Sequence, residues 1–132
     1  MAGSFSDYAE DKILDHLVGK TSFTMPSVWV GLSTADPLDD ASGNAEPAGG
    51  SYARKSTAGG DWAASSGGAI ANGGAITFAA ATGAWGTVTH FTLWDAVTAG
   101  NMLAHGDLTV SKAVTSGDTV EFAIGDLDIT LA

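Results

Sequence analysis

The sequence predicts a mainly β fold, namely a single-domain antiparallel β-sandwich or flattened barrel with one short N-terminal α-helix. The length of 132 residues is typical of one domain with one hydrophobic core. The 18 glycines, about twice the usual share, divide the apolar residues into short strand-sized runs. Apolar residues have helical spacing near the N-terminus, and period-two alternation follows. We therefore expect one domain over 1–132, with a β body from 27 to 132.

The N-terminal segment predicts a helix over residues 7–18. Apolar residues are spaced to line one side of this helix: Tyr8, Ile13, Leu14, Leu17 and Val18. Ser6 or Asp7 can cap its start, and Gly19 can supply a left-handed end. A helix of about three turns is marginal alone, so its apolar stripe is expected to pack on the sheet or on a neighbouring subunit. Residues 1–6 before it are expected to form an N-terminal arm.

Period-two alternation predicts the strands. In the segment 27–35, Val28, Val30 and Leu32 fall on one face and Trp29 on the other. Further strands are expected at 51–56, around Trp62, and at 75–81, 87–96, 101–110 and 119–132. The sequences TAGN at 98–101 and TSGD at 115–118 predict hairpin turns. Short strands joined by tight turns favour antiparallel neighbours.

Two segments predict long loops. The first, 36–50, contains two prolines, three glycines and four acidic residues in the run DPLDDASGNAEPAGG. The second, 59–74, is rich in glycine pairs. Long loops in compact domains are often functional or mobile, so we expect the acidic loop 36–50 to be a contact element.

Composition excludes several classes of partner. Fifteen acidic residues against five basic ones give a formal charge of -10, which repels phosphate groups, so no nucleic-acid partner is expected. No apolar run is long enough to span a bilayer, and the N-terminus lacks the pattern of a signal peptide. The absence of cysteine excludes disulfides and thiolate metal sites. We therefore expect an unexported, soluble chain with no membrane partner.

The stretch WGTVTHFTLWDAVTAGNMLAHG at 85–106 contains residues typical of active sites. On a strand, however, His90 and Asp95 point to opposite faces of the sheet. The chain also lacks a G-x-S-x-G nucleophile motif. We therefore expect no catalytic residues and no enzymatic activity.

Metal and cofactor sites have little support in the sequence. His16, His90 and His105 do not have the spacing of a zinc site. The acidic loop offers hard oxygen donors but misses the alternation of an EF-hand, so calcium binding there stays an alternative. The glycine pairs are not followed by the lysine and hydroxyl residue of a phosphate loop. No metal and no cofactor are expected.

The four tryptophans are expected mainly in core or inter-subunit packing. Two of them, Trp62 and Trp85, lie close to glycines and could instead present exposed rings. An exposed indole face is the usual platform for a sugar ring. Trp62 and Trp85 are therefore candidates for contact with a glycan or another partner.

The order of motifs resembles a known family. VGLSTADP at 30–37, WGTVTHFTLWDA at 85–96 and GDLDITL at 125–131 carry the resemblance, which covers nearly the whole chain. The chain is similar to a family of small tailed-bacteriophage virion proteins. Members are labelled as phage structural or tail-fibre proteins, and some look like capsid cement or decoration proteins.

The resemblance implies a bacteriophage virion structural protein, made in the cytoplasm of the host bacterium. Because the chain lacks heptads and β-helix repeats that could build a long shaft, we expect a capsid cement protein. It would bind the outer surface of the major capsid lattice as a homo-oligomer, most simply a trimer, and stabilise the lattice through many modest contacts. The expected contact residues are Phe5, Tyr8, Asp36, Leu38 and Asp39.

Two alternatives stay open. The protein could be a head-fibre, collar or tail component that contacts the host. It could also be a lectin-like or calcium-dependent binding module.

Overall fold

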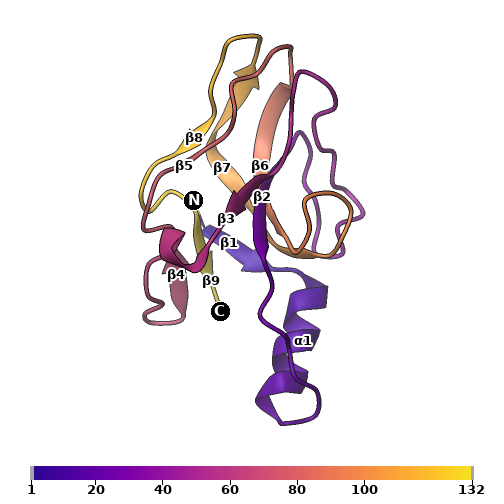
Figure 1. Ribbon diagram of the computed structural model, residues 1–132. Helices are drawn as coiled ribbons and strands as arrows, with labels where there is room; N and C mark the ends of the chain where they lie inside the picture. The colour runs from indigo at the N-terminus through magenta and orange to yellow at the C-terminus, as the bar shows by residue number, and fades with distance from the viewer. Residues whose placement is uncertain (1, 132) are drawn as a thin grey trace.

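The computed structural model describes residues 2–131. It contains one α-helix, one 3-10 helix and nine strands within this part of the chain: β1 (Ala2–Phe5), α1 (Asp7–Leu17), β2 (Val28–Ser33), β3 (Lys55–Thr57), η1 (Gly59–Asp61), β4 (Ala69–Ala71), β5 (Ile76–Thr77), β6 (Gly86–Trp94), β7 (Met102–Val114), β8 (Glu121–Phe122) and β9 (Asp128–Thr130). The predicted mainly β fold with one short α-helix is confirmed (Figure 1).

Seven strands form one curled sheet in the order β3-β2-β6-β7-β1-β9-β4, and β5 pairs with β8 in a separate ribbon. Neighbours are antiparallel, as expected, except β1 and β9, which run parallel. Both of these strands lie near the ends of the chain. Parallel neighbours need a long connection, and almost the whole chain lies between β1 and β9, so these two strands can pair in parallel.

The long strands β6 and β7 form the centre of the sheet and match the segments predicted at 87–96 and 101–110. The turn between them is held by Asp95, whose carboxylate accepts hydrogen bonds from the backbone N–H and side-chain amide of Asn101. β7 continues beyond the predicted end to Val114. Its register with β6 is irregular there, because residues 108–111 of β7 lie opposite Thr89 alone. This bulge interrupts the ladder at residues 108–111, and pairing with β6 resumes from Lys112 to Val114.

The N-terminal residues differ from the expected arm. Met1 lies outside the described residues, and residues 2–5 form β1, which is paired on both sides, with β7 and with β9. Gly3 allows this placement, because a Cβ atom at Gly3 would lie 2.7 Å from Cζ of Phe91. Its pairing partner Gly106 has the same constraint, with a virtual Cβ 2.7 Å from Cε1 of Phe91. Two glycines on paired strands thus make room for one aromatic ring.

Other expected strands are shorter or divided. The segment around Trp62 is a 3-10 turn followed by a single bridge from Trp62 to Asn72. The segment 119–132 is divided into β8 and β9, because Asp126 accepts a hydrogen bond from the Ala123 N–H and Gly125 adopts a φ of 84°. These residues form a turn where an uninterrupted strand was predicted.

The core lies between the curled sheet and the β5–β8 ribbon. Phe78 and Phe122 of the ribbon segments meet Trp85 and Phe91 from the side of the long sheet. The rings are in edge-to-face contact, with centroids 6.3 to 6.4 Å apart. Such contacts add to the free energy gained from burying the rings.

The helix α1 begins where it was predicted. Ser6 caps it by accepting a hydrogen bond from the Ala9 N–H, and Gly19 follows its end with a φ of 76°. Ala9 is its only buried residue, and the helix projects away from the β body (Figure 1). Within residues 2–131, no helix is long and apolar enough to cross a membrane.

Candidate functional site

The acidic loop 36–50 is shaped by its own carboxylates. Asp36 accepts a hydrogen bond from the Leu38 N–H, and Asp40 accepts one from the Ser42 N–H. Hydrogen bonds from the hydroxyl and backbone N–H of Ser42 hold the pKa of the Asp40 carboxyl below its usual value. Leu38 has a φ of 61° and exposes about half of its side chain. The loop therefore presents an apolar residue held in an uncommon backbone conformation.

Asp39 fastens this loop to the β body. Its Oδ1 lies 2.7 Å from Nε2 of His105 on β7. Its backbone carbonyl accepts a hydrogen bond from the Asp7 N–H at the start of α1. Of the predicted contact residues in the loop, Asp36 and Leu38 are exposed, and the Asp36 carboxylate bonds within the loop itself. Asp39 is instead tied to β7 and to the start of α1.

A buried arginine network holds the far end of the loop. Arg54 forms two hydrogen bonds to the carboxylate of Glu46, at 2.9 and 2.8 Å, and donates to the carbonyls of Ala96 and Ala99. Its guanidinium lies 4.0 Å from the centre of the Trp94 ring. The network joins the acidic loop to the turn between β6 and β7, and sequence reasoning missed it. The sequence offered only two adjacent basic residues, Arg54 and Lys55, after a loop rich in acids, and nothing in it indicated which of them pairs with which acid.

Tyr52 completes this network. Its hydroxyl donates to Oε1 of Glu46 and accepts a hydrogen bond from the Leu32 N–H on β2, both at 2.9 Å. Burial raises the pKa of the Tyr52 hydroxyl far above its usual value. The ring also stands edge-on to Trp85, with centroids 5.2 Å apart. Tyr52 therefore links the loop to both β2 and the aromatic core.

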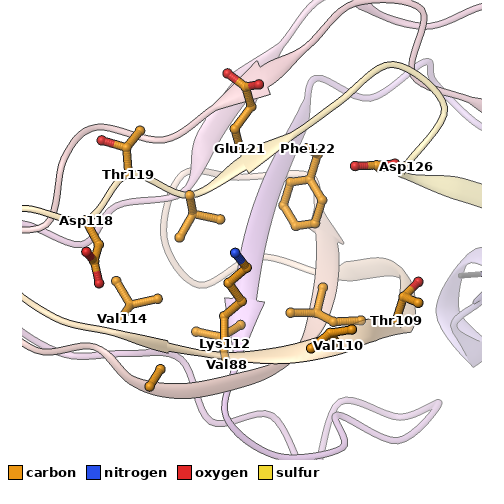
Figure 2. A pocket seen from close by; sticks show the side chains of 13 residues that line it. Val88, Thr109, Val110, Lys112, Val114, Asp118, Thr119, Glu121, Phe122 and Asp126 are labelled. Carbon is orange, nitrogen blue, oxygen red and sulfur yellow. The ribbon is translucent and has the colours of Figure 1, made fainter.

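One groove lies between the bulged part of β7 and the segment 118–122, and we name it the β7 groove (Figure 2). Its volume is about 700 Å³. Val88, Val114 and Phe122 form an apolar floor, and Lys112 extends into the space between the two segments. Asp118, Glu121 and Asp126 stand around it as the acidic members of the lining. The groove combines an apolar floor with charges of both signs.

A second and larger groove, of about 1080 Å³, opens between α1, the segment 23–28, residues 57–65 and the curled sheet. We name it the apolar groove. Its floor and walls include Phe5, Trp62, Ile70, Leu93, Leu103 and Ile129. Within the described part of the chain, no Asp, Glu, Lys, Arg or His lines it.

The structure brings two of the predicted contact residues together. Phe5 on β1 and Trp62 after η1 are both half-buried and line the apolar groove. Trp62 is fixed there by a hydrogen bond from its Nε1 to the Thr57 hydroxyl. Tyr8 does not line this groove; it lies beside Lys12 and lines a smaller pocket together with Asp39. No part of the sequence pattern indicated that Phe5 and Trp62 would share a surface.

Trp85 lies inside the protein. Its side chain is 4% exposed, and its Nε1 donates a hydrogen bond to the carbonyl of Gly50. The neighbouring glycines suggested an exposed ring, but Gly50 adopts a φ of 57° and turns its carbonyl toward the indole. The ring therefore contributes to core packing and has no free face for a sugar in this conformation.

The histidines on the long strands are paired with single carboxylates. His90 Nε2 lies 2.7 Å from Oδ1 of Asp107 across the β6–β7 ladder, and its Nδ1 contacts the Thr89 hydroxyl. Asp95 is occupied by the turn at Asn101, away from His90. Over residues 2–131, no three or more His, Asp or Glu side chains are grouped so that they could hold a metal ion.

The fold and its grooves define a β-rich protein with several surfaces suited to contacts. The family described as Podophage GP4 fiber I protein gp80 matches residues 4–130, from β1 through β9. The chain belongs to this family and is therefore a bacteriophage virion structural protein, as the resemblance of its motifs predicted. No curated protein matches the chain.

Proposed function

We propose that the chain is a fibre component of a podophage virion and contributes to contact with the host. The family match carries this proposal, because it covers residues 4–130 and the description of the family names a podophage fibre protein. A match of that extent includes the whole β body and both grooves, not a terminal anchor alone. This favours the head-fibre, collar or tail alternative over the expected capsid cement role.

The surfaces of the protein are consistent with a fibre subunit. The acidic loop and the two grooves present different chemistry, and the loop is held by the Arg54 network without covering either groove. A net charge of -10 disfavours nonspecific contact with phosphate-rich surfaces, so the host contact would depend on specific recognition. The exposed candidates for that contact are Asp36 and Leu38.

A capsid cement role is the second candidate. The observation that favours it is the compact body: residues 2–131 contain no long helix or repeated unit from which one chain could build a shaft. Under either role, assembly as a trimer and binding to the major capsid protein stay predictions.

The copy number per virion separates the two roles. Purified virions would be analysed by quantitative mass spectrometry, with the major capsid protein as the internal reference. A fibre component is expected in far fewer copies than the capsid subunit, and virions lacking it should adsorb to the host more slowly while keeping their resistance to heat. A ratio near one copy per capsid subunit, with normal adsorption and reduced heat resistance in its absence, would support the cement role.

A further inference from the structure

We propose that the β7 groove binds an extended segment of another protein of the same virion, which is added as a strand to the open edge of β7. The segment is recognised by its backbone and by an alternation of apolar and basic side chains. Such an interface does not require the fibre role, because it needs only that the chain is part of a virion.

The distal part of β7 has an open edge. β1 pairs with β7 from Ala104 to Gly106, and within residues 2–131 no other strand pairs with that side of β7. On the other side, residues 108–111 have no register partner in β6. Residues 107–113 also form no backbone hydrogen bond to the described residues outside the strands. An unpaired row of N–H and C=O groups is a template for a further strand.

The β7 groove lies along this edge. Consecutive residues of β7 line it, from Leu108 to Val110 and from Lys112 to Val114. Side chains of a strand alternate between its two faces, so a lining of consecutive residues means that the backbone itself borders the groove. The opposite wall is the segment 118–122, and each of its residues is again part of the lining (Figure 2). Two extended segments therefore border one space.

The opposite wall pairs along its other edge. The Val120 carbonyl accepts a hydrogen bond from the Phe78 N–H, and β8 pairs with β5 on the same side. In an antiparallel ladder, alternate residues direct their backbone groups to opposite sides. The backbone groups of Thr119 and Glu121 therefore point away from β5. A strand added to β7 can approach this second row of donors and acceptors.

The edge of β7 lacks the usual protection. Natural proteins commonly blunt an exposed edge with charged side chains or proline. The run LTVS at 108–111 contains neither, and Val110 in it is 70% exposed. Threonine and valine also favour extended structure. This stretch is therefore suited to receive a strand.

The lining of the groove selects the side chains of that strand. Val114 and Phe122 are buried in its apolar floor, which offers contacts to apolar side chains. Glu121 is next to Phe122 on the same strand, so its side chain lies on the opposite face, away from the floor (Figure 2). An added strand thus has an apolar surface on one face and a carboxylate on the other.

Charge favours a basic segment. Three carboxylates line the groove, those of Asp118, Glu121 and Asp126, against the single cation of Lys112. The three acidic residues are exposed and accept hydrogen bonds from neutral hydroxyl or backbone N–H groups. Among the described residues, none of them forms an ion pair. The best match is therefore a strand in which apolar and basic residues alternate.

A second copy of this chain does not supply such a segment. Its five basic residues are dispersed, and only Arg54 and Lys55 are adjacent. Arg54 is buried and paired with Glu46. Two chains that each carry a charge of -10 also repel one another. The donor is therefore a different polypeptide, and the lasting neighbours of a virion structural protein are other virion proteins.

A synthetic heptapeptide of alternating valine and lysine, with blocked ends, is the probe. Titrated into the isotope-labelled full-length protein, it should shift the amide NMR signals of residues 108–114 and 118–122 and slow the hydrogen exchange of their amides. We expect a Kd of about 1 mM or tighter at low ionic strength. A control peptide that alternates valine and glutamate should not bind, because the carboxylates of the groove repel it.

Backbone methylation of the probe separates strand addition from simple charge attraction. Two further peptides carry N-methyl groups on all valines or on all lysines, which removes the N–H donors along one edge or the other and keeps the charge. At least one of them should bind about tenfold more weakly, as expected for the loss of one or two hydrogen bonds.

Glu121→Lys tests the acidic lining. It should weaken the binding of the valine–lysine peptide about tenfold, because it replaces an attraction by a repulsion. Glu10→Lys is the matched control: it makes the same change of charge at an exposed position of α1 outside the groove, and it should leave the affinity unchanged. Circular dichroism verifies that both variants are folded.

Four results would each overturn the proposal: no amide shifts in the β7 groove, equal binding of the valine–glutamate peptide, full binding of both N-methylated peptides, or an unchanged affinity of Glu121→Lys. None of these measurements depends on whether the chain belongs to a fibre. The copy number and adsorption of virions therefore test the fibre role separately.

Discussion

Arg54 has the most demanding environment of any charged residue in the described chain. Its guanidinium is buried, paired with Glu46 on one edge, bound to two carbonyls on the other, and stacked on Trp94. A planar, permanently charged group with five donors is suited to such a site, and lysine is not equivalent there. The residue therefore explains why the acidic loop has a fixed position.

Removal of this side chain should destabilise the protein strongly. Arg54→Ala leaves Glu46 without its cation and two carbonyls without donors, and we expect a loss of about 3 kcal/mol in the free energy of unfolding. Urea denaturation measures it, and Lys55→Ala at the neighbouring exposed position serves as the control. A loss below about 0.5 kcal/mol, the usual range for a surface substitution, would show that the network contributes little.

Tyr52 gives the protein a predictable response to alkaline pH. Burial raises the pKa of its hydroxyl in the folded protein, whereas the pKa of a tyrosine in the unfolded chain is about 10. Above that pH the unfolded chain has lost the proton and the folded one retains it. Stability is therefore fully present below about pH 10 and falls as pH rises further.

Tyr52→Phe tests this response. The variant loses two hydrogen bonds and should be less stable at neutral pH, but its stability should fall less steeply than that of the wild type above about pH 10. Urea denaturation at a series of alkaline pH values measures both slopes. Equal slopes in the two proteins would refute the assignment of the alkaline loss to Tyr52.

At the scale of elements, the placement of β1 depends on two glycines. Gly106→Ala would bring a Cβ atom within 2.7 Å of Phe91 and 2.8 Å of Gly3, so the paired strands must separate or the ring must move. We expect a destabilisation of about 1–3 kcal/mol, as for overpacked cores. Gly74→Ala is the matched control, since a Cβ there meets nothing within 4 Å. Thermal unfolding compares them, and equal melting temperatures would contradict the account.

Local signals in the sequence predicted some elements well. The helix begins where it was predicted because Ser6 and the apolar spacing act within a few residues of one another. The β6–β7 hairpin was predicted because alternation and a turn sequence are also local. β1 was missed as a strand, since four residues acquire this role only through β7 and β9, which lie far along the chain.

The candidate site was harder to predict for the same reason. Phe5 and Trp62 were chosen separately, and only the curvature of the sheet places them in one groove. Trp85 was chosen for its glycine neighbours in the sequence, but the ring is buried and donates to the carbonyl of Gly50, which lies in a turn 35 residues earlier. Arg54 and Glu46 gave no sequence signal that they would pair. Pairings between distant segments are a property of the folded chain, and periodicity does not encode them.

At the scale of the whole molecule, sequence motifs identified the class of protein, a bacteriophage virion structural protein, whereas the expected capsid cement role is not confirmed by the family match. The absence of shaft-forming repeats suggested a cement protein, whereas the family that matches residues 4–130 is described by a fibre protein. A compact body can serve a fibre when several copies assemble. A chain with little shaft material is therefore compatible with a fibre role.

The position of the chain in the virion tests the fibre role most directly. Virions would be incubated with antibody fragments raised against the folded protein and imaged by cryo-electron microscopy. The account predicts bound fragments on structures that project from the particle. Fragments distributed evenly over the capsid lattice, flush with its surface, would contradict it.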